Sequence, residues 1–111
     1  MLPKKERLSR AEFNRFFSMG KRMHSPSVQV VYSPHPELHA SVVVSKKVAR
    51  LAVKRNKIRR RIYDIVRNYR LQNPVTGVFI FLTKPSVNTL TYEALKDEIQ
   101  TCIQKGTNIK R

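Results

Sequence analysis

The chain has 111 residues and a formal net charge of +16 at pH 7, from 23 Lys and Arg against 7 Asp and Glu. This length allows one domain with a modest hydrophobic core, so we expect residues 1–111 to form a single domain. The charge predicts a polyanionic partner. A single cysteine, Cys102, excludes an intrachain disulfide and a cysteine metal cluster, which is typical of a reducing cytoplasm.

No segment approaches the roughly 18 apolar residues of a membrane span. The first residues, MLPKKERLSR, are charged and are not followed by an apolar stretch, so no signal peptide is predicted. We therefore expect a soluble cytoplasmic protein without a membrane partner.

The first predicted helix runs from Arg10 to about Met19. Ser9 and Glu12 have the spacing of a capping box at its start, and Gly20 closes it. Its three phenylalanines share one face at positions i, i+3 and i+4: Phe13, Phe16 and Phe17. Aromatic residues at this spacing are more often core than a binding platform, and we expect Phe16 in the core.

Two strands are predicted next, in SVQVVYS (27–33) and LHASVVVS (38–45), with a turn from Pro34 to Pro36. In the first of them, one set of side chains (Val28, Val30, Tyr32) alternates with another (Gln29, Val31, Ser33). In all, two or three strands are expected before the basic segment that follows.

A strongly basic segment follows, in which eleven of the 23 basic residues lie between Lys46 and Arg70 with one acid, Asp64. The segment Val53 to Arg70 has helical periodicity and should end near Asn73-Pro74. Its apolar side carries Ile58, Ile62, Ile65, Val66 and Tyr69. Its outward side carries Asn56, Arg59, Arg60, Tyr63, Arg67 and Arg70, with Lys57 and Arg61 on the other flank.

We interpret this helix as docked on a core while it presents a basic face to a nucleic-acid backbone. A merely solvated face would normally interleave acids at i,i+4 to offset repulsion. A membrane-surface helix would need a free apolar side, which the neighbouring strands are expected to use.

The remaining elements are a central strand VFIFLT opened by Gly77 and bounded by Lys84-Pro85, and a last helix. Thr91 is the expected N-cap of this helix, and Gly106 its end. Its inner side carries Leu95, Ile99, Cys102 and Ile103. The fold class is therefore α+β, with one sheet packed with helices.

No catalytic or metal-binding group is predicted. The histidines His24, His35 and His39 are scattered, and Pro34 and Pro36 keep the last two off a shared helix face. The acids of the last helix, Glu93, Asp97 and Glu98, are explained by the helix dipole and solubility, and Cys102 by the core. The chain is therefore interpreted as a binding protein rather than a nuclease.

The segment SKKVARLAVKRNKIRRRIYDIVR resembles the protein subunit of bacterial ribonuclease P. That family has two lysines leaving a strand, a spacer, Arg-Asn-Arg, and a basic pair one residue on. The matching residues are Lys46, Lys47, Arg55, Asn56, Lys57, Arg59 and Arg60. Lys57 departs from the family's usual arginine and gives up its bidentate fork. The resemblance covers nearly the whole chain.

The resemblance implies a four-stranded mixed sheet in the order αβββαβα, with a left-handed βαβ crossover. It also implies an accessory role in 5′ maturation of precursor tRNA, in which a catalytic RNA subunit cleaves with bound Mg²⁺; no cofactor is assigned to the protein itself, and a metal ion in its cleft is left open. The implied partners are the RNA subunit and precursor tRNA, with no DNA. A basic ribosomal or RNA-chaperone protein fits the composition equally, but the lysine-pair and Arg-Asn spacing discriminates against it.

Two surfaces follow from the resemblance. The single-stranded leader would lie in a cleft between the first helix and the sheet, at Phe13, Phe17 and Tyr32, because aromatic faces stack on bases of any sequence. The RNA subunit would be bound by Lys46, Lys47, Arg50, Lys54, Arg55, Asn56, Lys57, Arg59, Arg60, Arg61 and Arg67.

Overall fold

The computed structural model describes residues 8–109 of the chain and confirms the predicted α+β class. The predicted elements are all present, together with a short 3₁₀ helix that was not predicted. In chain order the elements are α1 (Arg10–Met19), β1 (Lys21–His24), β2 (Val28–Ser33), β3 (Leu38–Val43), α2 (Ala52–Gln72), β4 (Gly77–Thr83), η2 (Pro85–Thr89) and α3 (Tyr92–Ile109).

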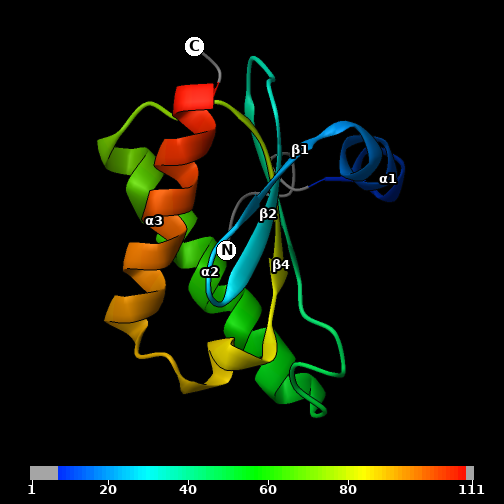
Figure 1. Ribbon diagram of the computed structural model, residues 1–111, viewed down its shortest axis with the longest axis vertical. Helices are drawn as coiled ribbons and strands as arrows, with labels where there is room; N and C mark the ends of the chain where they lie inside the picture. The colour runs from blue at the N-terminus through cyan, green and yellow to red at the C-terminus, as the bar shows by residue number, and fades with distance from the viewer. Residues whose placement is uncertain (1–7, 110–111) are drawn as a thin grey trace.

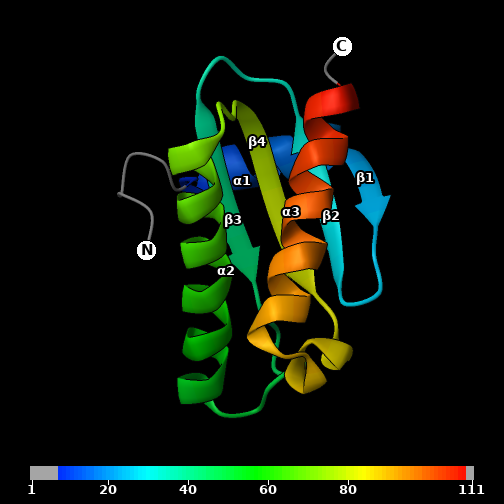
Figure 2. The same cartoon turned by 90° about the vertical axis from the view of Figure 1, so that its left-hand side faces the viewer.

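The four strands form one mixed sheet in the order β1-β2-β4-β3. β2 is antiparallel to β1 and β4, whereas β3 is parallel to β4, so β4 is central as predicted. Figure 2 views the sheet from the side of α2. There β3 and β4 both run downward, α2 lies in front of them, and β4 is to the right of β3. The crossover is therefore left-handed, as the resemblance implied and against the usual preference.

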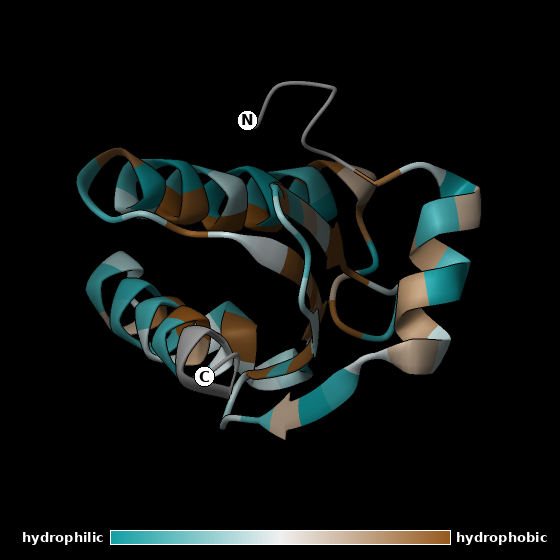
Figure 3. Ribbon diagram, turned by 90° about the horizontal axis from the view of Figure 1, so that it is seen from above, coloured by the Kyte–Doolittle hydropathy of each residue, from teal (hydrophilic) through white to brown (hydrophobic). Residues whose placement is uncertain are grey.

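The helices cover the two faces of the sheet unequally, which creates two separate sides. Helices α2 and α3 lie together on one face, and α1 lies alone on the other (Figures 1 and 3). The larger core cluster lies under α2 and α3, and a smaller one under α1 consists of Phe16, Val31, Val78 and Ile80. Alternation along β2 and β4 assigns each side chain to one of these sides.

The capping box predicted at the start of α1 is present. The Glu12 amide donates to the Ser9 hydroxyl at 3.2 Å, and the Ser9 amide donates to the Glu12 carboxylate at 3.0 Å. These bonds hold the pKa of Glu12 below its ordinary value. The stability that these bonds give the fold is present at pH values above the ordinary pKa of Glu12. It is lost as the pH falls through the lowered pKa of the folded state, because the carboxylate is then protonated.

The prediction that α3 ends at Gly106 is wrong, because the helix continues to Ile109. Gly106 lies where α3 packs closely against the side chains of the sheet. A Cβ there would be 2.8 Å from Cε1 of Phe79 and 3.0 Å from Cδ1 of Tyr32. The glycine permits close packing of the helix on the sheet and does not terminate it.

Tyr63 was predicted on the outward side of the basic helix, and this is also wrong. Its side chain is buried, and its hydroxyl accepts a hydrogen bond from the Val42 amide at 3.2 Å. Val42 belongs to the edge strand β3, which has no strand neighbour beyond it. Tyr63 therefore satisfies a donor of an otherwise open sheet edge, and the buried arc of α2 is wider than its aliphatic stripe.

Candidate nucleic-acid interface

The eleven residues predicted to bind an RNA subunit do come together, along α2 and the loop that precedes it. We call this set the basic surface. Most of its side chains are exposed, and Arg55, Arg59 and Arg61 are half-buried. Ile58, Ile62, Ile65 and Val66 hold the opposite side of α2 in the core. Burial of one side of α2 thus fixes the direction in which the charges face.

The start of α2 adds to this positive field. Leu51 is its N-cap and provides no side-chain hydrogen bond, and the first turn contains no acidic residue. The partial positive charge of the first-turn amides is therefore not offset by a local carboxylate. Lys46, Lys47 and Arg50 lie in the loop immediately before this end of the helix.

Arg55 differs from the other members of the basic surface because its guanidinium is already engaged. Nη1 donates to the carbonyl oxygens of Ala49 at 3.0 Å and Arg50 at 2.7 Å. From the second turn of α2 it thus ties down the loop that carries Arg50. Its geometry favours a role in positioning the loop.

We expect Arg55→Gln to lower the free energy of unfolding by about 1–2 kcal/mol, the low end of the range for charged hydrogen bonds because the site is half exposed. Arg60→Gln removes the same charge from an exposed position of α2 and should leave stability nearly unchanged. Urea unfolding of both variants measures the difference. Equal stability would contradict the bracing role of Arg55.

The other predicted surface lies on the side of the sheet that carries α1. The rings of Phe13 and Phe17 are stacked, with centroids 5.5 Å apart and planes at 20°. Both side chains are half-buried, whereas Phe16 is buried in the core as expected. Half-buried Val43 and Leu82 of the sheet pack against the same cluster. Phe13 and Phe17, with these neighbours, are called the aromatic surface below.

Arg22 is a member of this surface that sequence reasoning missed. It lies on β1 opposite Val31, and its guanidinium carbon is 4.6 Å from the centroid of the Phe17 ring. A cation at this distance over an aromatic face is attracted to the ring. No motif in the sequence marks Arg22, and its place beside Phe17 depends on the pairing of β1 with β2.

Tyr32 does not belong to the aromatic surface, so its prediction as a leader-binding residue is wrong. Its side chain is 1% exposed and lies in the core under α2 and α3, on the opposite face of the sheet from α1. The ring packs on Phe79 with centroids 4.9 Å apart. Burial raises the pKa of its hydroxyl.

The buried Tyr32 hydroxyl has no hydrogen-bond partner among the described residues. An unpaired buried hydroxyl costs about 1–3 kcal/mol. We therefore expect Tyr32→Phe to be neutral or to raise the melting temperature, and to leave RNA binding unchanged. A clear loss of stability in thermal unfolding would show that the hydroxyl has a partner.

The histidines are less scattered than predicted. His35 lies in the β2–β3 turn and His39 is the second residue of β3, and the turn brings their rings edge to face with centroids 4.7 Å apart. The Glu37 amide donates to Nδ1 of His35 at 3.0 Å. Within residues 8–109, no group of three or more His, Cys, Asp or Glu side chains is placed to hold a metal ion.

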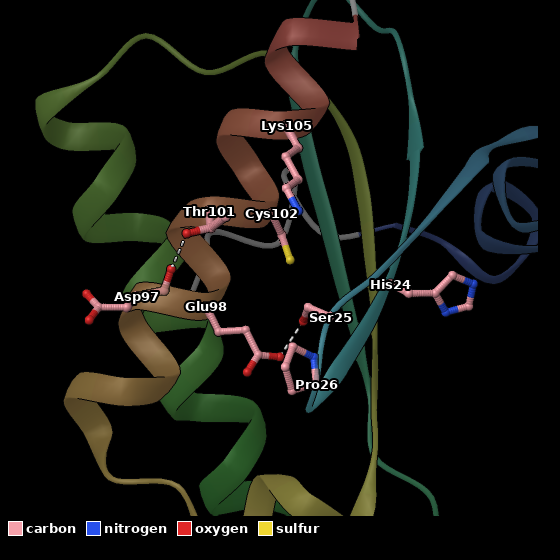
Figure 4. A pocket seen from close by; sticks show the side chains of 8 residues that line it. All are labelled: His24, Ser25, Pro26, Asp97, Glu98, Thr101, Cys102 and Lys105. Carbon is pink, nitrogen blue, oxygen red and sulfur yellow. Dashed lines mark hydrogen bonds between the residues drawn. The ribbon is translucent and has the colours of Figure 1, made fainter.

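Of the acids of α3, Glu98 has a structural role that the sequence did not predict, at the pocket shown in Figure 4. The Glu98 carboxylate accepts hydrogen bonds from the Ser25 hydroxyl and from the Ser27 amide, the latter at 2.8 Å. Glu98 thus fastens the β1–β2 turn to α3. Cys102 beside it is buried, as predicted, and burial raises the pKa of its thiol.

In the part of the chain that the structure describes, no helix is long and apolar enough to cross a membrane.

Comparison with known proteins agrees with these features. A family model described as Ribonuclease P matches residues 2–107. The chain is 35% identical over 87 residues to the Ribonuclease P protein component of Thermus brockianus, which covers 78% of this chain and 51% of that protein. It is 31% identical over 111 residues to the same component of a Pseudanabaena species, which covers 96% of this chain and 95% of the relative. The chain thus spans about half of the Thermus protein and nearly all of the other.

Solved structures show the same fold. The RNase P protein of Staphylococcus aureus matches with a TM-score of 0.78 at 20% identity, covering 90% of this chain and 93% of that one. The RNase P protein of Thermotoga maritima matches with a TM-score of 0.79 at 19% identity, covering 90% and 96%. Because the family model matches almost the whole length of the chain, the chain belongs to the ribonuclease P protein family.

Proposed function

We propose that the protein is the accessory subunit of a ribonuclease P ribonucleoprotein, in which it binds the RNA subunit through the basic surface. The observation that carries this proposal is the arrangement of α2. Its apolar side is buried against the fold while Lys54, Lys57, Arg60 and Arg67 remain exposed on the other sides. An RNA helix offers phosphates at a spacing that such a row of cations can follow.

The aromatic surface is the proposed site for the single-stranded 5′ leader of precursor tRNA. Phe13 and Phe17 are half-buried aromatic side chains, a residue type that stacks on bases of any sequence, and Arg22 adds positive charge beside them. Because the aromatic and basic surfaces lie on opposite faces of the sheet, the protein would bind leader and RNA subunit at the same time.

The proposed enzyme is the complex, with cleavage performed by the RNA subunit. Mg²⁺ would be bound through that RNA, and the protein's own residues would bind and orient the two RNAs. This role belongs in the cytoplasm, with neither DNA nor a membrane as a partner.

The test is cleavage of a precursor tRNA by a bacterial ribonuclease P RNA at low Mg²⁺, with and without the protein. We expect the protein to restore cleavage that the RNA performs poorly alone, and the protein alone to cleave nothing. Polylysine of equal total charge is the control for simple charge neutralisation. Cleavage by rigorously RNA-free protein, or equal rescue by polylysine, would overturn the proposal.

A further inference from the structure

A hollow at the amino-terminal end of α2 combines apolar walls with cations. It has a volume of about 330 Å³ and is lined by Val48, Ala49, Arg50, Leu51, Lys54 and Asn88. A second hollow of about 270 Å³ shares Lys54 and Asn88 with it and is otherwise lined by Lys57, Ile58, Arg61 and Val87. Neither lining includes an acidic residue. Together they form one site, which we call the double pocket.

The walls of the double pocket are held in place by hydrogen bonds from outside the loop. The Asn88 side-chain amide donates to the Val48 carbonyl at 2.6 Å and to the Pro85 carbonyl at 3.1 Å. Arg55 holds the next two carbonyls of the loop from α2. Figure 2 shows η2 beside this loop near the start of α2. A site fixed from two elements binds with little further ordering cost.

The two halves of the pocket differ in chemistry. The first has an apolar wall of Val48, Ala49 and Leu51 and is also lined by Arg50 and Lys54, and Leu51 is 60% exposed although it is a large apolar side chain. The second has three cations, Lys54, Lys57 and Arg61, together with the apolar side chains of Ile58 and Val87. An inorganic phosphate would contact the cations but not the apolar wall. An apolar ligand would contact the wall but leave the cations without a partner. A nucleotide has one group for each half.

We propose that the double pocket binds one unpaired nucleotide of the RNA partner, with the base against the wall of Val48, Ala49 and Leu51 and its phosphate at Lys54, Lys57 and Arg61. Recognition of a splayed-out base with its flanking phosphate is a common way for proteins to find one position on a structured RNA. The proposal rests on the RNA-binding function proposed above and adds a single point of registration to the basic surface.

The first test is titration of the full protein with adenosine 5′-monophosphate, ribose 5-phosphate and inorganic phosphate, followed by NMR. We expect the nucleotide to shift the methyl resonances of Leu51, Val48 and Ala49 through the ring current of its base. The two base-free probes should shift only groups near Lys54, Lys57 and Arg61. Equal methyl shifts from ribose 5-phosphate would mean an anion site only. Absence of any shift with the nucleotide would overturn the proposal.

The second test uses Leu51→Ser, which removes the most exposed apolar wall without changing charge. Because serine is a preferred N-cap residue, the variant should fold at least as well as the parent. We expect its affinity for a bacterial ribonuclease P RNA to fall about five- to tenfold, as part of a leucine contact is lost. The dependence of binding on salt should not change.

Val53→Ser is the matched control, because Val53 is 72% exposed on the same helix but lines neither half of the pocket. Its affinity should stay within about twofold of the parent protein, as for other surface substitutions. Equal effects of Leu51→Ser and Val53→Ser would overturn the proposal. Neither result depends on cleavage. The proposal of a nucleotide site can therefore be rejected without rejecting the proposed accessory function in tRNA maturation.

Discussion

Phe17→Ala should weaken binding of precursor tRNA to the assembled enzyme by about 1–3 kcal/mol, the range for loss of one base stacked on an aromatic ring. The half-buried ring lies on the aromatic surface beside Phe13 and the Arg22 guanidinium, where it is the proposed platform for one leader base. Mature tRNA, which has no leader, should bind as before. Equilibrium binding of precursors with increasing leader length measures the effect.

The length series sharpens this test. Affinity for the parent enzyme should stop rising once a few nucleotides reach the aromatic surface, and Phe17→Ala should lose this dependence while it still binds the RNA subunit. Phe17→Leu is the matched control, since it keeps apolar packing on the small core but has no aromatic face. If the leucine variant binds precursor like the parent, Phe17 packs rather than stacks.

Phe16 shows why folding must be measured beside binding. It lies one residue away and is buried in the small core, so its truncation should cost about 3–5 kcal/mol of stability whatever the ligand. A Phe17 variant that unfolds, or that loses precursor and mature tRNA equally, would assign Phe17 to the core as well.

The element order and most helix limits were predictable from the sequence because they depend on local chemistry. The Ser9–Glu12 capping box, the Thr91 N-cap of α3, and the apolar stripe of α2 are each set by residues a few positions apart. The left-handed crossover was known only through the family resemblance. Periodicity carries no information about the hand of a connection.

The errors share a different cause, which is a partner distant in sequence. Tyr63 is buried because the edge strand β3 supplies an amide donor, and the helical angle of Tyr63 does not reveal that donor. Gly106 stays helical because Phe79 and Tyr32 leave no room for a side chain. Tyr32 belongs to the large core with Val28 and Val30, and the alternation along β2 does not by itself reveal which of its two sets of side chains faces α1.

The basic surface illustrates the same division. Charge and helical periodicity predicted that the basic surface exists. They did not predict the role of each of its residues. Arg55 bonds to the loop before α2, whereas Nη1 of Arg59 donates to Oδ1 of Asn56 at 3.4 Å. Some residues of the basic motif therefore hold other parts of the protein in position, whereas others can contact phosphate. The dependence of RNA affinity on salt can distinguish the two kinds.

Removing Arg59 and Arg60 together should have the largest effect on affinity for the RNA subunit. If each contacts one phosphate, the slope of log affinity against log salt should fall by about 0.7–0.9 per residue. Over the interval from 1 M to 0.1 M salt, two such contacts amount to roughly 25- to 60-fold in affinity. Filter binding of the RNA across a salt series measures both quantities.

Two control variants test whether the loss of affinity comes from the position of Arg59 and Arg60 or only from the loss of net charge. Lys96→Ala with Lys105→Ala removes the same charge from α3, so it tests whether the net field alone drives binding. Asn56→Ala removes no charge and frees Arg59, so it should weaken binding with little change of slope. If the α3 variant weakens binding as much as the Arg59 and Arg60 variant, the basic surface of α2 is a solvated face. A loss confined to α2 would instead mean that burial of its apolar side has fixed its arginines in register with the phosphates.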